Sequence, residues 1–395
     1  MQTPEYTSLL FLRSHSPYPP RGGADIRDMN LIKAFSEIMP VTILCFSANQ
    51  ADTPSSPSLQ IPQHVKIDFI SREAIPLWKK VFYPIRPYVV NGFSSSMAKA
   101  LKTHVQEGKK ILWISRLGMA QYIPIAKALG FKVILDEHNV ESHLLFKASF
   151  SSLKTLPTTI LATQCAFYER NFCQQSDHVV ATSDIDASRL HKLAPYAKVS
   201  VIPSSVDSKV YQNTRTQVGN SILFSGALDY FPNIQGLLWF VRKVLPRLRA
   251  ALKSQCPAMV VAGSNPSREL IEMLRQDQIE TYPNPPSMLP YLGDAAVVVV
   301  PILQGGGTRL KILEAMASAR AVISTGKGAE GLVLSPGYDI FIADDADAFA
   351  SGIVKLLNNP DLRAQLGQHA AATVDSRYDW QCMKNHVQNL LKSQI

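Results

Sequence analysis

The amino-acid sequence predicts an α/β protein made of two doubly wound, Rossmann-like domains, each with a parallel sheet. Three observations predict this fold class: short β-branched runs that alternate with helical segments, the repetition of that alternation in two halves, and a length of 395 residues. A single hydrophobic core rarely grows beyond about 250–300 residues, so a chain of this length suits two domains. Alternating strands and helices are typical of a parallel sheet that is covered on both faces.

Each half contributes a series of short apolar strands followed by helical stretches. In the first half the predicted strands are Ser8–Leu12, Val41–Phe46, Ile111–Ile114, Val133–Leu135 and Val179–Thr182. In the second half they are Ile222–Phe224, Met259–Ala262, Ala296–Val300, Val322–Ser324 and Ile340–Ile342. We expect a first domain over residues 1–203, a polar linker over 204–219 and a second domain over 220–376. The C-terminal segment 377–395 is expected to be helical over Gln381–Leu391.

The composition is that of a folded protein with ample core. Hydrophobic residues make up 46% and charged residues 18% of the chain, which argues against disorder. The N-terminal segment has too short an apolar run for a signal peptide, and no run approaches the roughly 18 residues that span a bilayer. We therefore expect a cytoplasmic protein. The five cysteines form no CxxC pair and the nine histidines lack metal-binding spacing, so we expect free thiols and no structural metal.

The strongest functional signal is Gly305–Ala317, GGGTRLKILEAMA, which directly follows the buried apolar run Ala296–Pro301. Glycines let the backbone approach a ligand, and the first N–H groups of the following helix can bind an anion. Arg309 and Lys311 add positive charge. Glu314 lies about one turn further on nearly the same helix face, where its carboxylate can accept two neighbouring hydroxyls such as those of a ribose. The alternative is a crossover helix whose charged side chains point to solvent.

This segment and five others together resemble the retaining nucleotide-sugar glycosyltransferases of family 4, which have the two-domain GT-B fold. The others are PYPPRGGADIRDMNL from Pro17, DEHNVES from Asp136, DHVVATSDIDASRL from Asp177, VIPSSVD from Val201 and LFSGALDYFPN from Leu223. Their order and spacing over nearly the whole chain carry the resemblance. It implies two domains facing a cleft, an acceptor-side N-terminal domain, a donor-binding C-terminal domain, and a last helix that crosses back to the N-terminal domain.

The resemblance also implies the residues that bind the donor. They are Gly22, Gly23, Gly226, Asn233, Gly305, Gly306, Gly307, Thr308, Glu314, Glu330 and Gly331. In this interpretation Gly226 and Asn233 border the nucleotide, and Glu314 fixes the ribose. Gly22 and Gly23 follow Arg21 in a loop that feeds a helix starting near Asp25, so they lie over the donor phosphates or the acceptor, or else form only a rigid turn.

His138 is the candidate active-site residue of the N-terminal half. It follows the strand Val133–Leu135, and a parallel sheet binds its ligands at the carboxyl ends of its strands. Neighbouring carboxylates at Asp136, Glu137 and Glu141 would raise the pKa of the imidazole and orient its ring. His138 would then donate a hydrogen bond to a sugar hydroxyl or relay a proton. The alternative is a structural histidine, although the resemblance puts the family's active-site histidine here.

Two departures from the family pattern affect the expected charge balance. Gly306 stands where the family has the first glutamate of its Glu-x7-Glu pair, and the ten residues after Gly226, ALDYFPNIQG, contain no lysine or arginine. Positively charged residues at other positions must therefore balance the negative charge of the diphosphate. We expect Arg309 and Lys311 to do so, and we count them with His138 as the catalytic residues.

The expected reaction is metal-independent transfer of a sugar from a nucleoside diphosphate sugar to an acceptor hydroxyl with retention, and no cofactor is implied. Two other classes stay open: a GT-B nucleotide-sugar epimerase, which needs no acceptor, and an inactive nucleotide-sugar-binding scaffold. A dehydrogenase is poorly supported because no GxGxxG follows the first strand. The Asp-x-Asp triplets at Asp184 and Asp345 sit at probable helix starts, where aspartate is a good cap, so we assign them no metal.

The charge of the chain favours acidic partners. The net charge is +9 and the pI about 9.2. Residues 75–90, IPLWKKVFYPIRPYVV, mix aromatic and basic side chains in a manner suited to an anionic membrane surface, or else form a packed loop with solvated cations. We expect a UDP- or GDP-sugar donor, a lipid-linked or glycan acceptor, peripheral contact with the inner face of the plasma membrane, a role in surface polysaccharide or glycolipid assembly, and no nucleic acid.

Overall fold

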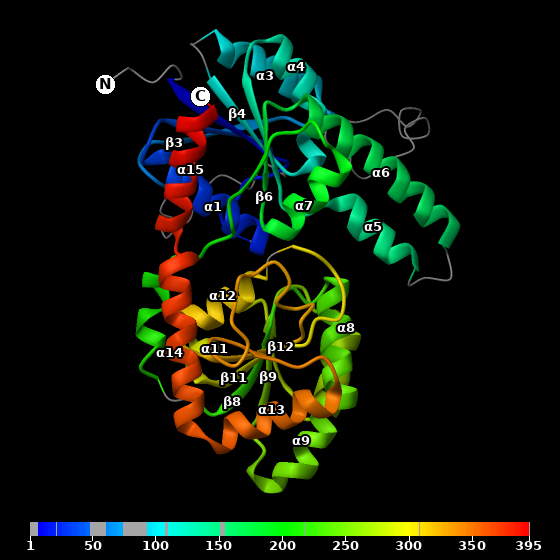
Figure 1. Cartoon of the computed structure of the whole chain (residues 1–395), viewed down its shortest axis with the longest axis vertical. Helices are drawn as coiled ribbons and strands as arrows, with labels where there is room; N and C mark the ends of the chain where they lie inside the picture. The colour runs from blue at the N-terminus through cyan, green and yellow to red at the C-terminus, as the bar shows by residue number, and fades with distance from the viewer. Residues whose placement is uncertain are drawn as a thin grey trace. The chain divides into compact units, whose positions relative to one another are not determined.

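The computed structural model describes residues 7–20, 22–47, 61–73, 93–106, 110–150, 155–217, 219–307 and 309–394. Arg21, Thr308 and the basic aromatic segment 75–90 therefore lie outside the described residues. The chain forms two compact α/β units (Figure 1). The first comprises Met1–Pro20, Ala24–Pro203 and Met383–Ile395, and the second Arg21–Gly23 and Ser204–Cys382. Within the described residues, none of the helices combines the length and apolarity that crossing a membrane requires.

The first unit is built on a seven-stranded parallel sheet with the order β3-β2-β1-β4-β5-β6-β7. Its strands are β1 Ser8–Leu12, β2 Val41–Phe46, β3 Val65–Ile70, β4 Lys110–Ser115, β5 Lys132–Glu137, β6 His178–Ala181 and β7 Val199–Val201. The strand order reverses between β1 and β4. In open α/β sheets the ligand site lies at such a reversal, beyond the carboxyl ends of the strands.

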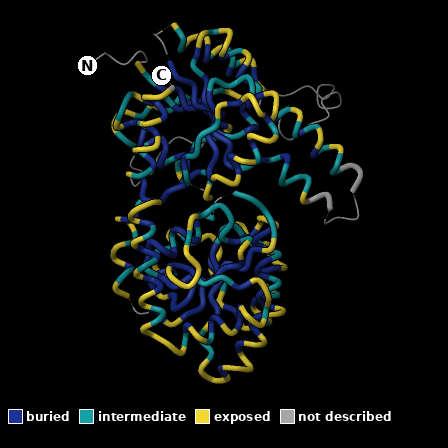
Figure 2. Tube along the Cα trace, in the orientation of Figure 1, coloured by how far each residue is buried: buried dark blue, intermediate teal, exposed yellow. Residues whose placement is uncertain are grey.

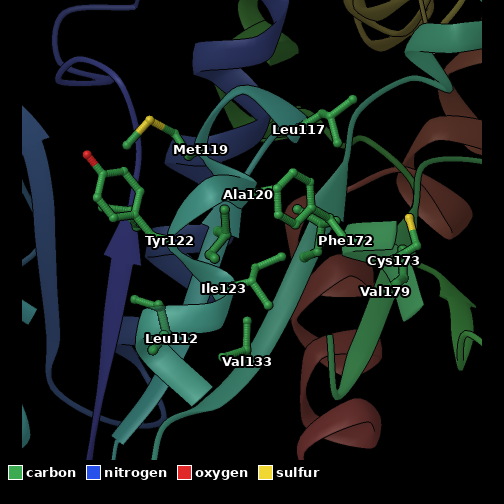
Figure 3. Packing of buried hydrophobic residues seen from close by; sticks show 14 of the residues in the cluster. Leu112, Leu117, Met119, Ala120, Tyr122, Ile123, Val133, Phe172, Cys173 and Val179 are labelled. Atoms are coloured by element: carbon green, nitrogen blue, oxygen red, sulfur yellow. The ribbon is translucent and has the colours of Figure 1, made fainter. Parts of the chain in front are cut away.

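Helices cover both faces of this sheet. They are α1 Gly23–Ser36, α3 Ser95–Val105, η2 Leu117–Tyr122, α4 Ile123–Ala128, α5 Glu141–Phe150, α6 Thr155–Gln175, α7 Asp184–Leu193 and α15 Trp380–Gln394. Side chains alternate along β1, so Leu10 joins one core cluster and Leu9 the other. Figure 3 shows the first cluster, in which β4, β5 and β6 side chains meet those of η2 and α6. Met383 and Val387 of α15 belong to the second cluster, so the last helix completes the core of the N-terminal unit.

The second unit contains a six-stranded parallel sheet with the order β10-β9-β8-β11-β12-β13. Its strands are β8 Ser221–Ser225, β9 Met259–Gly263, β10 Glu280–Pro283, β11 Ala295–Val300, β12 Ala321–Ser324 and β13 Phe341–Ile342. Around it lie η3 Ser208–Thr214, α8 Phe231–Trp239, the π-helical segment η4 Phe240–Val244, α9 Leu245–Leu252, η5 Lys253–Gln255, α10 Arg268–Gln276, α11 Leu289–Asp294, α12 Leu310–Ala317, α13 Ala346–Asn358 and α14 Pro360–Arg377. The central strands β8 and β11 are buried along their whole length (Figure 2).

The predicted fold class is confirmed, but the prediction missed three strands, β3, β7 and β10. All three lie at a sheet edge. Their residues are mostly half-buried or exposed, so they lack the continuous apolar run that marks a central strand. The Asp-x-Asp triplets do lie at helix starts: the Asp345 side chain accepts hydrogen bonds from the N–H groups of Asp347 and Ala348 at the start of α13. All five cysteines are free thiols, and three of them are buried.

Candidate functional site

The glycine-rich turn after β11 is shaped by glycines with positive φ. Gly305 has φ +108° and Gly307 φ +76°. These left-handed conformations suit glycine, because a Cβ would strain them. The turn leads into α12, which begins at Leu310, one residue after Arg309. Strand, turn and helix therefore follow in the predicted order.

The guanidinium of Arg309 folds back over this turn. Its Nη1 donates a hydrogen bond of 2.6 Å to the carbonyl oxygen of Gly306, and a Cβ placed on Gly305 would lie 2.8 Å from Nη2. Its Nε atom is buried and has no hydrogen-bond partner among the described residues. Arg309 thus stabilises the glycine turn and keeps one unused N–H group.

Lys311 reaches across the sheet edge to the end of β8. Its Nζ donates a hydrogen bond of 2.9 Å to Oδ1 of Asn233 and lies 4.8 Å from the centroid of the Phe224 ring. A Cβ on Gly226 would lie only 2.5 Å from Nζ, so the ammonium occupies space that the glycine leaves open. Burial, together with the charge of Arg309, lowers the pKa of Lys311 to about 7. Three residues predicted to surround the donor, from two segments far apart in the sequence, therefore lie together.

Glu314 is half-buried on α12 rather than solvated, and its carboxylate is held by a residue that the sequence did not single out. The hydroxyl of Tyr211, in η3, donates a hydrogen bond of 3.1 Å to Oε1 of Glu314. Burial raises the pKa of Glu314, while the Tyr211 hydrogen bond and the nearby Lys311 act in the opposite direction. Lysine and glutamate side chains three positions apart on the helix thus influence each other, as their spacing predicts.

The loop after β12 carries the last two predicted donor residues. Glu330 forms an ion pair with Lys327, and Gly331 has φ +89°. The strands β8, β11 and β12 are parallel neighbours, so their carboxyl ends lie at the same end of the sheet. The segments that follow them, with Gly226, Gly305 and Glu330, therefore begin at that end. The predicted donor residues of the second unit thus lie at the carboxyl end of its sheet, although only some of them are in contact.

In the N-terminal unit, His138 is buried directly beyond the end of β5. Its Nε2 lies 3.1 Å from Oδ2 of Asp136 and 3.3 Å from Oδ1 of Asp28. Burial disfavours the charged imidazolium, but the two carboxylates outweigh burial and raise the pKa of His138. The Nδ1 atom is buried without a hydrogen-bond partner among the described residues. A protonated His138 would therefore present an unused N–H donor at Nδ1.

The prediction of which carboxylates surround His138 was only partly right. Asp136 does contact the ring, but the second carboxylate is Asp28 of α1 rather than Glu137 or Glu141. The reason is the alternation of a strand, which turns neighbouring side chains to opposite faces. Glu137 instead belongs to an acidic cluster with Glu169, and burial followed by the charge of Glu169 raises the pKa of Glu137.

Two buried arginines balance the aspartates next to His138. Arg27 donates to both oxygens of Asp136, at 2.7 and 3.2 Å, and lowers the pKa of that carboxyl to about 2 despite its burial. Arg13 pairs with Asp28 at 3.1 Å between Nη1 and Oδ2. Ligand atoms of Asp28, Asp136 and His138 lie within 4.8 Å of one another, a spacing that suits a metal ion. The guanidinium groups already compensate both carboxylates, however, so this donor set fits a cation poorly.

Five residues of these two sites were missed at the sequence level as functional candidates: Arg13, Arg27, Asp28, Arg116 and Tyr211. Arg27 and Asp28 lie on helix α1, and both side chains are buried although charged residues of a helix usually face solvent. Arg116 has φ +72°, a strained value for a non-glycine residue, and its Nη2 lies 3.8 Å from Oδ1 of Asp25. The available signal was the density of charged residues in ADIRDMN, which a surface helix explains equally well. Gly22 precedes α1, which begins at Gly23.

Comparisons with known proteins find similar sequences for part of the chain. Residues 219–359 match the sequence model of the family described as glycosyl transferases group 1. A curated protein of Klebsiella pneumoniae, described as an uncharacterised 44.6 kDa protein in the cps region, is 26% identical over 168 residues. The match covers 40% of this chain and 42% of that protein, so the chain spans less than half of the relative's length.

Nearly the whole chain resembles solved structures in fold. Sucrose-phosphate synthase from Thermosynechococcus elongatus has a TM-score of 0.74 at 17% identity, over 98% of both chains. The HepE protein of Anabaena, solved with UDP, has a TM-score of 0.69 at 13% identity, over 98% of this chain and 100% of that one. Identities this low establish the fold alone. It is the GT-B fold of two parallel-sheet α/β domains.

Proposed function

We propose that this chain is a group 1 glycosyltransferase of the family 4 type, which transfers a sugar from a nucleoside diphosphate sugar to an acceptor hydroxyl with retention. The observation that carries the proposal is the contact between Lys311, Asn233 and Gly226 at the edge where α12 presents Glu314. All four lie within residues 219–359, the stretch that matches the glycosyltransferase model. The Anabaena protein of similar fold binds UDP, which supports a nucleotide donor.

In this proposal Lys311 carries the positive charge that the diphosphate needs. Because the pKa of Lys311 is about 7, the side chain is a mixture of charged and neutral forms near neutral pH when no nucleotide is bound. A diphosphate close to Nζ favours the ammonium form, so nucleotide binding draws a proton onto Lys311. The unused Nε–H of Arg309 and the N–H groups of the glycine turn add further donors. Donors fixed before the reaction stabilise the leaving diphosphate without reorganising.

The proposed reaction breaks the bond between the anomeric carbon and the diphosphate oxygen and forms one to the acceptor oxygen on the same face of the sugar. The acceptor proton passes to the departing phosphate oxygen, so atoms and charge balance. Glu314 accepts the ribose hydroxyls, and His138 offers Nδ1–H to a sugar hydroxyl. A second carboxylate for double displacement is not required by this route.

The acceptor is proposed to be a glycan or a lipid-linked sugar used in surface polysaccharide or glycolipid assembly. The net charge of +9 favours an acidic acceptor or an anionic membrane surface. The curated Klebsiella relative is described as lying in a cps region, which agrees with this proposal. Product analysis distinguishes transfer from epimerisation, since only transfer consumes an acceptor.

The test is a thermal-shift panel of UDP, GDP and ADP, followed by calorimetric titration of whichever nucleotide binds. At about 100 times its Kd, one ligand stabilises the folded state by about 2.7 kcal/mol, which is a rise of about 5 °C or more for this size of domain. We expect that rise with one nucleotide, and we expect it to be lost in Lys311→Met. Lys243→Met, at an exposed position of the same unit, serves as the control. A panel without any shift overturns the proposal.

A further inference from the structure

Tyr211 lies in η3, within the segment 204–219 that the sequence predicts to be a polar linker, yet its hydroxyl contacts a predicted donor-site residue 103 positions further along the chain. The Oη–Oε1 distance to Glu314 is 3.1 Å. Within the described part of the chain, Tyr211 is the only residue that donates a hydrogen bond to this carboxyl group. The second oxygen, Oε2, therefore has no hydrogen-bond donor among the described residues.

The segment that carries Tyr211 is anchored on both sides. At its start, the backbone N–H and the hydroxyl of Ser208 donate to Asp379 Oδ2 at 3.0 and 2.8 Å. At its end, the buried guanidinium of Arg320 donates to the carbonyl oxygen of Thr214. These contacts all lie within the second unit. The phenol is thus held against Glu314 by the fold, and not by a flexible surface contact.

The electrostatics make Tyr211 a permanent donor. Burial, then the charge of Glu314, and to a smaller extent Asp207, raise the pKa of the phenol far above its usual range. A neutral phenol donates a stronger hydrogen bond to an ionised Glu314 than to a protonated one, so the contact favours the carboxylate form. Lys311 acts in the same direction, whereas burial opposes it. The charged groups that act on this pair are therefore Lys311 and Asp207, and Arg309 acts in turn on Lys311.

We infer that Tyr211 is a positioning residue of the nucleotide site, which fixes the carboxylate of Glu314 so that it accepts the ribose hydroxyls of a nucleoside diphosphate. This inference rests on the proposed function. The phenol occupies one lone pair of Oε1 and sets the orientation of the carboxylate plane. The remaining lone pairs on Oε1 and Oε2 are then directed at the two adjacent hydroxyls of a ribose.

The test removes only the hydroxyl, in Tyr211→Phe, and measures calorimetric affinities for UDP and for 2′,3′-dideoxy-UDP. If the panel above selects GDP or ADP, that nucleotide and its dideoxy form are used. Loss of one hydrogen bond is expected to weaken UDP binding by roughly three- to tenfold. Binding of the dideoxy form, which has no hydroxyls for Glu314, is expected to be the same in both proteins. Tyr282→Phe is the matched control, because Tyr282 donates a 3.0 Å hydrogen bond to Glu280 on the exposed edge strand of the same unit.

A pH profile separates positioning from simple packing. UDP affinity falls at low pH as Glu314 becomes protonated. Because the Tyr211 hydrogen bond lowers the pKa of Glu314, its removal moves the midpoint of that fall to higher pH. Equal losses for UDP and the dideoxy form, or an unchanged midpoint, overturn the inference and leave the proposed function standing. Failure of the wild-type protein to bind any nucleotide overturns both.

Discussion

Replacing Lys311 by methionine is expected to stabilise the empty protein while it weakens nucleotide binding. The pKa of Lys311 falls from 10.5 to about 7 on folding. Each pKa unit is worth about 1.4 kcal/mol, so a difference of about 3.5 corresponds to roughly 5 kcal/mol against the folded state when the lysine is charged. The side chain is partly exposed, and its removal leaves Asn233 Oδ1 without its donor. We therefore expect a net gain in unfolding free energy of about 2–4 kcal/mol at pH 7.

The pH dependence has a defined sign. Between pH 7 and about 10.4, the unfolded chain holds a proton on Lys311 that the folded protein has released. Folding stability of the wild type should therefore rise with pH in this range, and the advantage of Lys311→Met should shrink as pH increases. In the same variant, UDP binding should weaken by roughly 10- to 150-fold, the effect expected when a hydrogen bond to a charged group is lost.

The assay is urea denaturation at pH 7 and pH 9, with and without nucleotide, for the wild type, Lys311→Met and the exposed-lysine control Lys243→Met. The control should match the wild type in both properties. Two results would refute the reasoning: a Lys311→Met protein that is less stable than the wild type at pH 7, or one that retains the full nucleotide-induced stabilisation. The first would mean that the ammonium stabilises the fold, and the second that it lies away from the diphosphate.

Three other changes have defined outcomes. Gly226→Ala puts a Cβ 2.5 Å from Lys311 Nζ at φ +140°, so titration should show UDP affinity reduced at least tenfold, whereas affinity within twofold of wild type would contradict this packing. Arg27→Met leaves the buried Asp136 with His138 as a partner but without its guanidinium, and chemical denaturation should show a loss of about 3 kcal/mol; a loss below about 1 kcal/mol would argue against the buried pair. Glu137→Gln should stabilise the protein, because it removes a buried carboxylate whose negative charge is opposed by burial and by the neighbouring Glu169. Since the folded pKa of Glu137 is raised, the gain should grow as pH rises above about 4.5, and a gain that is constant with pH would count against it.

The local sequence pattern was sufficient to predict those parts of the structure that depend on residues close together in the chain. The apolar run before Gly305, the glycines and the α12 sequence predict a strand, a turn and a helix, and that is what forms. The relation of Lys311 to Glu314 also follows from helical spacing. By contrast, the edge strands went unrecognised because their half-exposed residues carry no strong period, and their pairing partners lie far away in sequence.

The sequence by itself therefore determined the fold class, the alternation of elements and the donor-site helix, because these depend on periodicity and turn chemistry within a few residues. Only the tertiary structure decided that Asp28, from α1, faces His138 and that Tyr211 donates to Glu314. Both contacts join segments about 100 residues apart. Whether a charged side chain is a solvated surface group or half of a buried pair depends on such contacts, and a local pattern carries no information about them.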